Sequence, residues 1–226
     1  MKSQKHTSLK DIAQALGVSV PTVSRALKDS PDISRALCEK AKWMAREMNY
    51  RPNPFALSLR KNAPRIIGVV VPDIVTHFFA SILNGIENMA VKNGYFVIIT
   101  TSHESYEHEK RNVENLVNMR VEGIIACLSQ ETTDYTHFAE LKDINMPLIM
   151  FDRVCLTDQF SSVVADGEHS AQMATQHLLD NGCKRVAFIG GANHLDIVKR
   201  RKHGYLEALR NNKIPIEKEL VVCRKI

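Results

Sequence analysis

Residues 8–28 have the sequence SLKDIAQALGVSVPTVSRALK, and this stretch decides the fold of the first part of the chain. Ser8 and Asp11 have the spacing of a capping box, in which a hydroxyl and an acid satisfy free amides at a helix start. The apolar residues that follow share one helical face, and Gly17 can adopt the positive φ that ends a helix. The pattern predicts a short amphipathic helix that stops at Gly17.

A second short helix is expected directly after this turn. Ser19 can cap it, and Pro21 is tolerated in its first turn, where amides lack an intrahelical partner. The helix is expected to run to about Lys28, with Val23 and Leu27 among its inward-facing residues. Two short helices separated by a glycine-containing turn are typical of a helix-turn-helix.

Residues 34–49 predict a third helix. Its apolar residues fall at offsets of 0, 4, 7, 8 and 11, which is one face at helical period: Leu37, Ala41, Met44, Ala45 and Met48. This stripe is expected to close a small core under the first two helices. Trp43 lies off the stripe, and we expect it to pack at the rim.

Charge is distributed unevenly along the chain. Residues 1–65 contain 13 lysines and arginines against 5 acidic residues, a net charge of +8, whereas residues 66–226 carry 17 against 20, a net charge of −3. A basic first part on a slightly acidic body is typical of a nucleic-acid-binding module joined to another domain. On charge alone, a lysine-rich surface that serves solubility explains the pattern equally well.

The first sixty residues resemble the DNA-binding head of the lactose/galactose-repressor family. The resemblance is carried, in the family's order and spacing, by residues 11–13 (DIA), 17–19 (GVS), 22–25 (TVSR) and 49–53 (NYRPN). It implies that the second helix enters the major groove of double-stranded DNA. One departure is residues 36–38 (ALC), which replace a common Thr-Arg pair and remove a phosphate contact.

The resemblance also assigns DNA-binding roles within the second helix. Arg25 can donate two hydrogen bonds to guanine, and Val20 can contact a thymine methyl group. The expected base readers are Val20, Pro21, Ser24 and Arg25, and the expected phosphate contacts are Ser19, Thr22 and Lys28. Because one head reads only a half-site, the resemblance implies a homodimer on a pseudo-palindromic operator.

Residues 53–64 (NPFALSLRKNAP) are expected to form a short hinge helix. Asn53 can cap it, Pro54 suits its first position and Pro64 stops it. By resemblance, Leu59 is a wedge into the minor groove and Arg60 reaches phosphate or the groove floor. The alternative is an ordinary linker with incidental helix propensity.

From residue 66 onward, apolar strands and helices alternate. Strands are expected at 66–71, 95–100, 123–126, 147–151, 186–189 and about 220–223, and helices at 78–93, 106–119 and about 168–181. Continuous apolar strands that alternate with helices predict an α/β fold with a doubly wound parallel sheet. Ligands of such sheets bind beyond the carboxyl ends of the strands.

Two groups of side chains follow predicted strands and form a candidate effector site. Asp73, Phe78 and Phe79 follow the first strand, and Asp152 and Arg153 follow the strand at 147–151. Aromatic rings opposite a charged pair are suited to a sugar, since rings cover the apolar face and charges bond the hydroxyls. Alternatively, the phenylalanines belong to the core and the Asp-Arg pair lies at the surface.

The body resembles the periplasmic-binding-protein-like effector domain of the same family. The matching stretches include 94–95 (GY), 121–125 (VEGII), 152–153 (DR) and 201–205 (RKHGY), and the resemblance adds Arg201 to the effector site. Thr76 and His77 replace the family's usual asparagine and proline. Because the family's chains continue through further strands and helices, this chain is expected to be truncated, with an incomplete second lobe.

Other function classes lack their motifs. Residues 190–193 (GGAN) are not a GxGxxG loop, GxxxxGK[ST] is absent, and no nucleophile or metal constellation stands at a family spacing. We therefore expect no enzyme activity, no cofactor and no metal. A solute-binding transport protein needs a secretion signal and has no use for a basic head, and a purely architectural DNA binder does not need the long α/β body.

The sequence also predicts the compartment and the domain boundaries. The absence of an apolar signal core or membrane-spanning run, and five scattered cysteines without a CxxC pair, predict a cytoplasmic protein whose thiols are mostly buried. The expected parts are a helix-turn-helix head (1–52), a hinge (53–64) and an effector domain (65–226). Together they predict a transcription regulator, a repressor by resemblance, controlled by a small molecule that is a sugar or sugar derivative.

Overall fold

The computed structural model describes residues 7–50 and 65–224. The chain divides into two compact units, one that ends at Asn62 and one that begins at Ala63. We describe each unit by itself. The predicted hinge at 53–64 lies outside the described residues.

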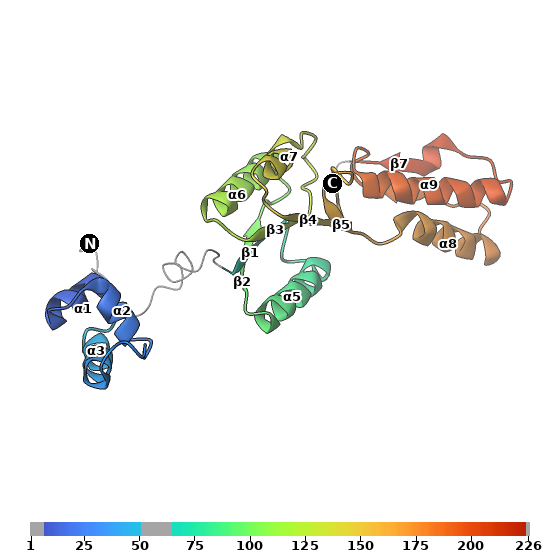
Figure 1. The fold of residues 1–226 in the computed structure, drawn as a ribbon. Coiled ribbons are helices and arrows are strands. Elements are labelled where there is room, and N and C mark those ends of the chain that lie inside the picture. The colour runs from blue at the N-terminus through green and yellow to red at the C-terminus, as the bar shows by residue number, and fades with distance from the viewer. Residues whose placement is uncertain (1–6, 51–64, 225–226) are drawn as a thin grey trace. The chain divides into compact units, whose positions relative to one another are not determined.

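The first unit contains three helices, α1 (Leu9–Leu16), α2 (Val20–Ala26) and α3 (Arg35–Glu47) (Figure 1). The predicted capping box is present: the Ser8 amide donates to Asp11 Oδ2 at 2.8 Å, and the Asp11 amide donates to Ser8 Oγ at 3.3 Å. Gly17 has a φ of 69° and ends α1, as expected. The second and third helices end earlier than predicted, since α2 stops at Ala26 and α3 at Glu47.

The core of the first unit lies where the three helices meet. Its fully buried residues are Ile12, Val23, Ala26 and Ala41. Four of the five residues of the predicted stripe of α3 face this core, all except the half-buried Leu37, and Cys38 adds to them. Trp43 is exposed, with 55% of its surface accessible, so it does not pack at the rim as expected. These contacts fix the orientation of α2, the helix that carries the candidate DNA-binding residues.

The second unit is built on a five-stranded parallel sheet. The strands are β1 (Ile66–Val71), β2 (Phe96–Thr101), β3 (Gly123–Ala126), β4 (Leu148–Phe151) and β5 (Ser161–Val163), in the order β2-β1-β3-β4-β5. The parallel pairing of every neighbour confirms the α/β class. It also places the carboxyl ends of all five strands at one edge, where the candidate effector residues follow β1 and β4.

Helices cover the two faces of this sheet unequally. Helix α5 (His77–Lys92) packs on one face, and α6 (Tyr106–Asn118) and α7 (Thr136–Asp143) pack on the other (Figure 1). The sequence patterns did not predict α7. A helix is about 10 Å wide and neighbouring strands lie about 4.8 Å apart, so one helix covers roughly two strands. The part of the chain that the structure describes therefore covers the face that carries α5 only partly.

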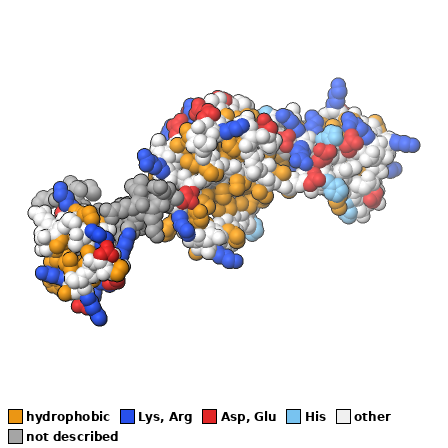
Figure 2. Space-filling model, viewed as in Figure 1, with side chains coloured by type: hydrophobic (Ala, Val, Ile, Leu, Met, Phe, Trp, Pro, Cys, Tyr) orange, Lys and Arg blue, Asp and Glu red, His pale blue; other side chains and the backbone are white. Residues whose placement is uncertain are grey.

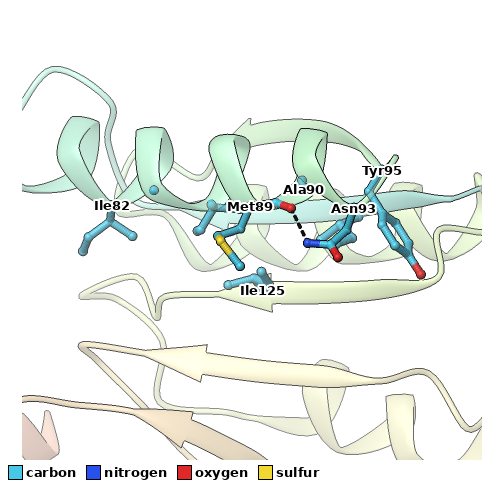
Figure 3. A pocket seen from close by; sticks show the side chains of 9 residues that line it. Ile82, Met89, Ala90, Asn93, Tyr95 and Ile125 are labelled. Atoms are coloured by element: carbon cyan, nitrogen blue, oxygen red, sulfur yellow. Dashed lines mark hydrogen bonds between the residues drawn. The ribbon is translucent and has the colours of Figure 1, made fainter.

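An apolar groove with a volume of about 520 Å³ runs between α5 and the sheet. Figure 3 shows Ile82 and Met89 of α5 on one side and Ile125 of β3 on the other. The Asn93 side chain donates to the Met89 carbonyl at 2.8 Å near one end of the groove. Beside Ile125 in the sheet, Ile149 of β4 keeps 43% of its surface exposed. Figure 2 shows hydrophobic side chains gathered in this part of the unit.

The last part of the second unit forms a separate small sheet. Strands β6 (Phe188–Gly190) and β7 (Val221–Cys223) pair in parallel, and α8 (Gly167–Asp180), α9 (Asp196–Asn211) and the 3-10 turn Lys218–Leu220 complete it. Helix α9 did not emerge from the sequence patterns, and β6 starts two residues later than expected. Helices α8 and α9 lie side by side, and a Cβ on Gly204 of α9 would overlap the Glu168 carbonyl of α8. In the described ranges, no helix combines the length and apolar character needed to cross a membrane.

Candidate nucleic-acid interface and candidate effector site

Helix α2 has one face in the core and one face in solvent. The core side contains Val23, which is fully buried, and Ser24, which is 8% exposed. Val20 packs partly against the same core. The solvent side contains the predicted contacts that remain accessible, namely Ser19, Pro21, Arg25 and Lys28, with Thr22 half-buried beside them. The head thus presents a polar, positively charged strip along α2.

The two hydroxyl residues at the start of α2 bond each other. The Thr22 amide donates to Ser19 Oγ at 3.3 Å, and the two side-chain oxygens lie 2.7 Å apart. This arrangement satisfies an amide that has no partner inside the helix. It also holds both hydroxyls at the end of the strip, where the remaining free amides and the helix dipole favour a phosphate oxygen.

The structure brings together most, but not all, of the predicted DNA contacts. Pro21 and Arg25, one turn apart on α2, are the predicted base readers with exposed side chains. Val20 and Ser24 lie on the core side of the helix, so little of Ser24 is accessible to a base edge. Leu59 and Arg60, the predicted hinge contacts, lie outside the described residues.

The predicted aromatic pair of the effector site has one buried and one exposed ring. Phe79 is 5% exposed and packs with Val69, Val71 and Phe151 in the core beneath α5. Phe78 is 50% exposed, and its ring centroid lies 5.2 Å from that of Phe79 in an edge-on arrangement. Of the two alternatives raised by the sequence, the core position describes Phe79, and only Phe78 presents its ring to solvent.

Hydrogen bonds hold Arg153 in place at the carboxyl edge of the sheet. Its Nη1 donates to both carboxylate oxygens of Glu104, at 2.9 and 2.8 Å, and lies 3.3 Å from the Leu128 carbonyl oxygen. The arginine side chain is only 16% exposed and the glutamate side chain 34% exposed. Glu104 stands on the loop after β2, and sequence patterns did not single it out.

Asp152 and Arg201 complete the charged group at this edge. Burial raises the pKa of the Asp152 carboxyl, and the positive charges of Arg153 and Arg201 partly offset that increase. Asp152 has a φ of 58°, an uncommon backbone conformation for a residue other than glycine. Asp73 follows β1 and accepts the Val75 amide at 2.9 Å, so it shapes its own loop. The predicted charged residues therefore line one edge of the unit.

A second polar cluster was missed by sequence reasoning. Glu109 of α6 is fully buried, and its carboxylate accepts hydrogen bonds from the Ser129 amide at 2.6 Å and from Thr132 Oγ1 at 2.7 Å. His137 Nε2 lies 3.1 Å from the same carboxylate. The cluster joins α6, α7 and the loop after β3, so it fixes the loop that carries Gln130 beside Glu104.

Comparisons with known proteins agree with both units. Residues 8–53 match the model "Bacterial regulatory proteins, lacI family", and residues 65–223 match "Periplasmic binding proteins and sugar binding domain of LacI family". The second match alone extends over more than half of the chain.

Curated relatives are similar in sequence over more than nine tenths of this chain. The chain is 31% identical to the catabolite control protein A of Priestia megaterium over 222 residues, which cover 96% of this chain and 65% of that protein. It is 29% identical to the ribose operon repressor of Halalkalibacterium halodurans over 92% of this chain and 61% of the repressor. The chain thus spans less than two thirds of the length of these relatives.

Solved structures show the same fold. One is the lac repressor dimer bound to operator and the anti-inducer ONPF, with a TM-score of 0.73 and 25% identity over 97% of this chain and 66% of that chain. Another is the transcription regulator CcpA of Lactococcus lactis, with a TM-score of 0.65 and 28% identity over 70% of this chain and 58% of that chain. Fold, motifs and family models agree, and the chain belongs to the LacI family.

Proposed function

We propose that this chain is a sequence-specific DNA-binding transcription regulator, a repressor, and not an enzyme. The observation that carries the proposal is an exposed strip formed by Pro21 and Arg25 of α2 and by Lys28 just after it, while the other side of α2 is fixed in the core. Arg25 is the main base reader because its guanidinium can donate two hydrogen bonds to guanine O6 and N7. Ser19, Thr22 and Lys28 bind phosphates and position the helix.

The remaining predicted contacts belong to the same proposal. Leu59 and Arg60 act at the minor groove, and Val20 adds an apolar contact at the start of α2. Two copies of the chain bind the two halves of a pseudo-palindromic operator, since one head covers only a half-site. The names of the relatives, among them a ribose operon repressor and a lac repressor bound to operator, support this proposal.

The effector site of the proposal lies at the carboxyl edge of the five-stranded sheet. Phe78 offers an exposed ring, and Asp73, Asp152, Arg153 and Arg201 offer polar groups for hydroxyls. A carbohydrate or a sugar derivative matches this combination, because its faces are apolar and its rim carries donors and acceptors. Its binding changes the affinity of the head for the operator.

The deciding experiment is a mobility-shift assay with a pseudo-palindromic operator library at several salt concentrations. The wild-type chain is expected to select half-sites, and Arg25→Ala is expected to lose about 1–3 kcal/mol of discrimination at one base pair. Arg46→Ala is the matched control, since it removes an equal charge from the exposed surface of α3 in the same unit. Equal binding of all sequences by the wild type would show charge-driven association and refute the proposal.

A further inference from the structure

The loop after β2 holds a carboxylate against the arginine of the candidate effector site. Arg153 Nη1 donates to both carboxylate oxygens of Glu104. The backbone amide of Gln130 donates to Glu104 Oε2 at 2.7 Å. Two consecutive residues of this loop, His103 and Glu104, have φ values of 51° and 61°. Such conformations cost energy in residues other than glycine and gather at functional sites.

A buried acceptor without a donor lies in the same place. Gln130 Oε1 is buried and has no hydrogen-bond partner among the described residues, while Gln130 Nε2 lies 3.5 Å from Glu104 Oε1. A buried acceptor without a partner is costly, so an unmet acceptor beside Glu104 is a feature of this loop that needs an explanation. One unmet hydrogen-bonding group beside the Glu104–Arg153 pair is therefore an acceptor.

The charges around Arg153 strengthen this conclusion. Glu104 and Asp152 are both acidic and both interact with Arg153, and Arg201 is a second positive charge near Asp152, so two carboxylates face two arginines at this edge. A phosphate or carboxylate that approached Arg153 would meet the Glu104 carboxylate at short range and be repelled. A hydroxyl group is both donor and acceptor, so it can bond the guanidinium and the carboxylate at once.

We propose that Glu104 sets the charge selectivity of the effector site: by holding Arg153, it excludes phosphorylated and carboxylated ligands and leaves the site to uncharged, hydroxyl-rich ones. This inference rests on the proposed function in placing the effector at Arg153. Glu104 acts here as a specificity-determining residue through its charge. Removing that charge while keeping the shape of the side chain is expected to turn Arg153 into an anion site.

The test uses inorganic phosphate as the probe and the full 226-residue chain at low ionic strength. Binding is followed by NMR at the backbone amide of Gln130, which reports this loop; the Arg153→Gln change distinguishes phosphate bound here from phosphate bound elsewhere on the chain. Wild type and Glu107→Gln, which removes an exposed acid from α6, are expected to show no saturable shift of this signal. Glu104→Gln is expected to show a saturable shift, at least about tenfold tighter than any phosphate binding by the wild type, and Glu104→Gln/Arg153→Gln is expected to lose it.

Two results would overturn the inference. One is saturable phosphate binding by the wild type that Arg153→Gln abolishes, because Glu104 would then not exclude anions. The other is a folded Glu104→Gln chain that ignores phosphate. Glu104→Ala, which removes the charge without introducing an amide, replaces Glu104→Gln if the latter does not fold. The phosphate result does not depend on DNA, so a failed mobility shift with the expected phosphate result refutes only the proposed function.

Discussion

Arg25 Nη1 lies 3.3 Å from Asp32 Oδ2, so the main candidate base reader is paired with an acid of its own unit. Asp32 is held in turn by Ser30, whose hydroxyl donates to Asp32 Oδ1 at 3.2 Å. Both members of the ion pair are more than half exposed, and such pairs contribute little to stability. Asp32 therefore competes with guanine for the arginine and repels nearby phosphates.

Asp32→Asn is expected to strengthen binding to operator DNA by up to about fivefold, because exposed pairs are worth roughly 0–1 kcal/mol. Non-operator DNA should gain similarly from the loss of phosphate repulsion. Mobility shifts at low and moderate salt measure both effects. Glu39→Gln, which breaks the exposed Arg35–Glu39 pair on α3, is the control and should change affinity less. Weaker operator binding by Asp32→Asn would instead indicate that Asp32 positions Arg25.

Gly204→Ala is expected to destabilise the second unit by about 1–3 kcal/mol, because the new methyl group must push α9 away from the α8 backbone. Urea unfolding followed by far-UV circular dichroism measures the change. Trp43 is the sole tryptophan and lies in the first unit, so the unfolding transition that its fluorescence reports should not shift in Gly204→Ala. Gly85→Ala is the matched control on α5, where a Cβ meets nothing within 4 Å and helix propensity improves by about 1 kcal/mol. Equal effects of the two changes would contradict the close contact of α8 and α9.

Glu109→Gln is expected to lower the free energy of unfolding of the second unit by about 2–4 kcal/mol. An amide cannot accept from the Ser129 amide, Thr132 and His137 together, so at least one buried donor loses its partner. The same urea experiment applies. Glu114→Gln, an exposed change on the same helix, should leave the midpoint unchanged. A midpoint shift of equal size in both variants would show that the buried Glu109 cluster stabilises the second unit no more than an exposed glutamate does.

Thiol labelling is expected to separate the cysteines by burial. Cys183 is exposed and should react first with iodoacetamide, whereas burial raises the pKa of Cys127 and of Cys155 to about 12 and keeps both protonated and unreactive. Peptide mass spectrometry identifies the labelled sites. Because their folded pKa values are raised, these two thiols favour folding below their unfolded pKa of about 9 and lose that contribution as pH rises toward 12. Fast labelling of Cys127 at neutral pH in the folded protein would refute the burial.

Local rules predicted the first unit well because its signals act over short distances. The Ser8–Asp11 capping box and Gly17 fix the start and end of α1 without help from the rest of the chain. Ser24 shows the limit of this reasoning. Its hydroxyl and its place in a DNA-binding motif suggested a base contact, but it lies four residues after Val20 on the side of α2 that faces the core.

In the second unit, most strands were predicted from continuous apolar runs, whereas the two helices α7 and α9 were not predicted. Gly204 lies in the middle of α9, and glycine inside a helix is an unfavourable signal for one. The close contact with the α8 backbone explains the glycine at this position. That contact is tertiary, so the local sequence does not reveal it. The buried Glu109 did leave a signal: it lies on the apolar face of α6, four residues before Val113 and seven before Leu116. The Glu104–Arg153 pair joins residues 49 positions apart, and no local pattern reveals it.

Among the described residues, α5 is the one helix on its face of the five-stranded sheet, and this affects how the protein responds to temperature. Apolar side chains such as Ile149, already hydrated in the folded state, contribute little new hydration when the chain unfolds. The heat capacity of unfolding should therefore fall below the average of about 12–15 cal/mol/K per residue. A smaller heat capacity change flattens the dependence of stability on temperature, so the loss of stability on cooling should be shallow.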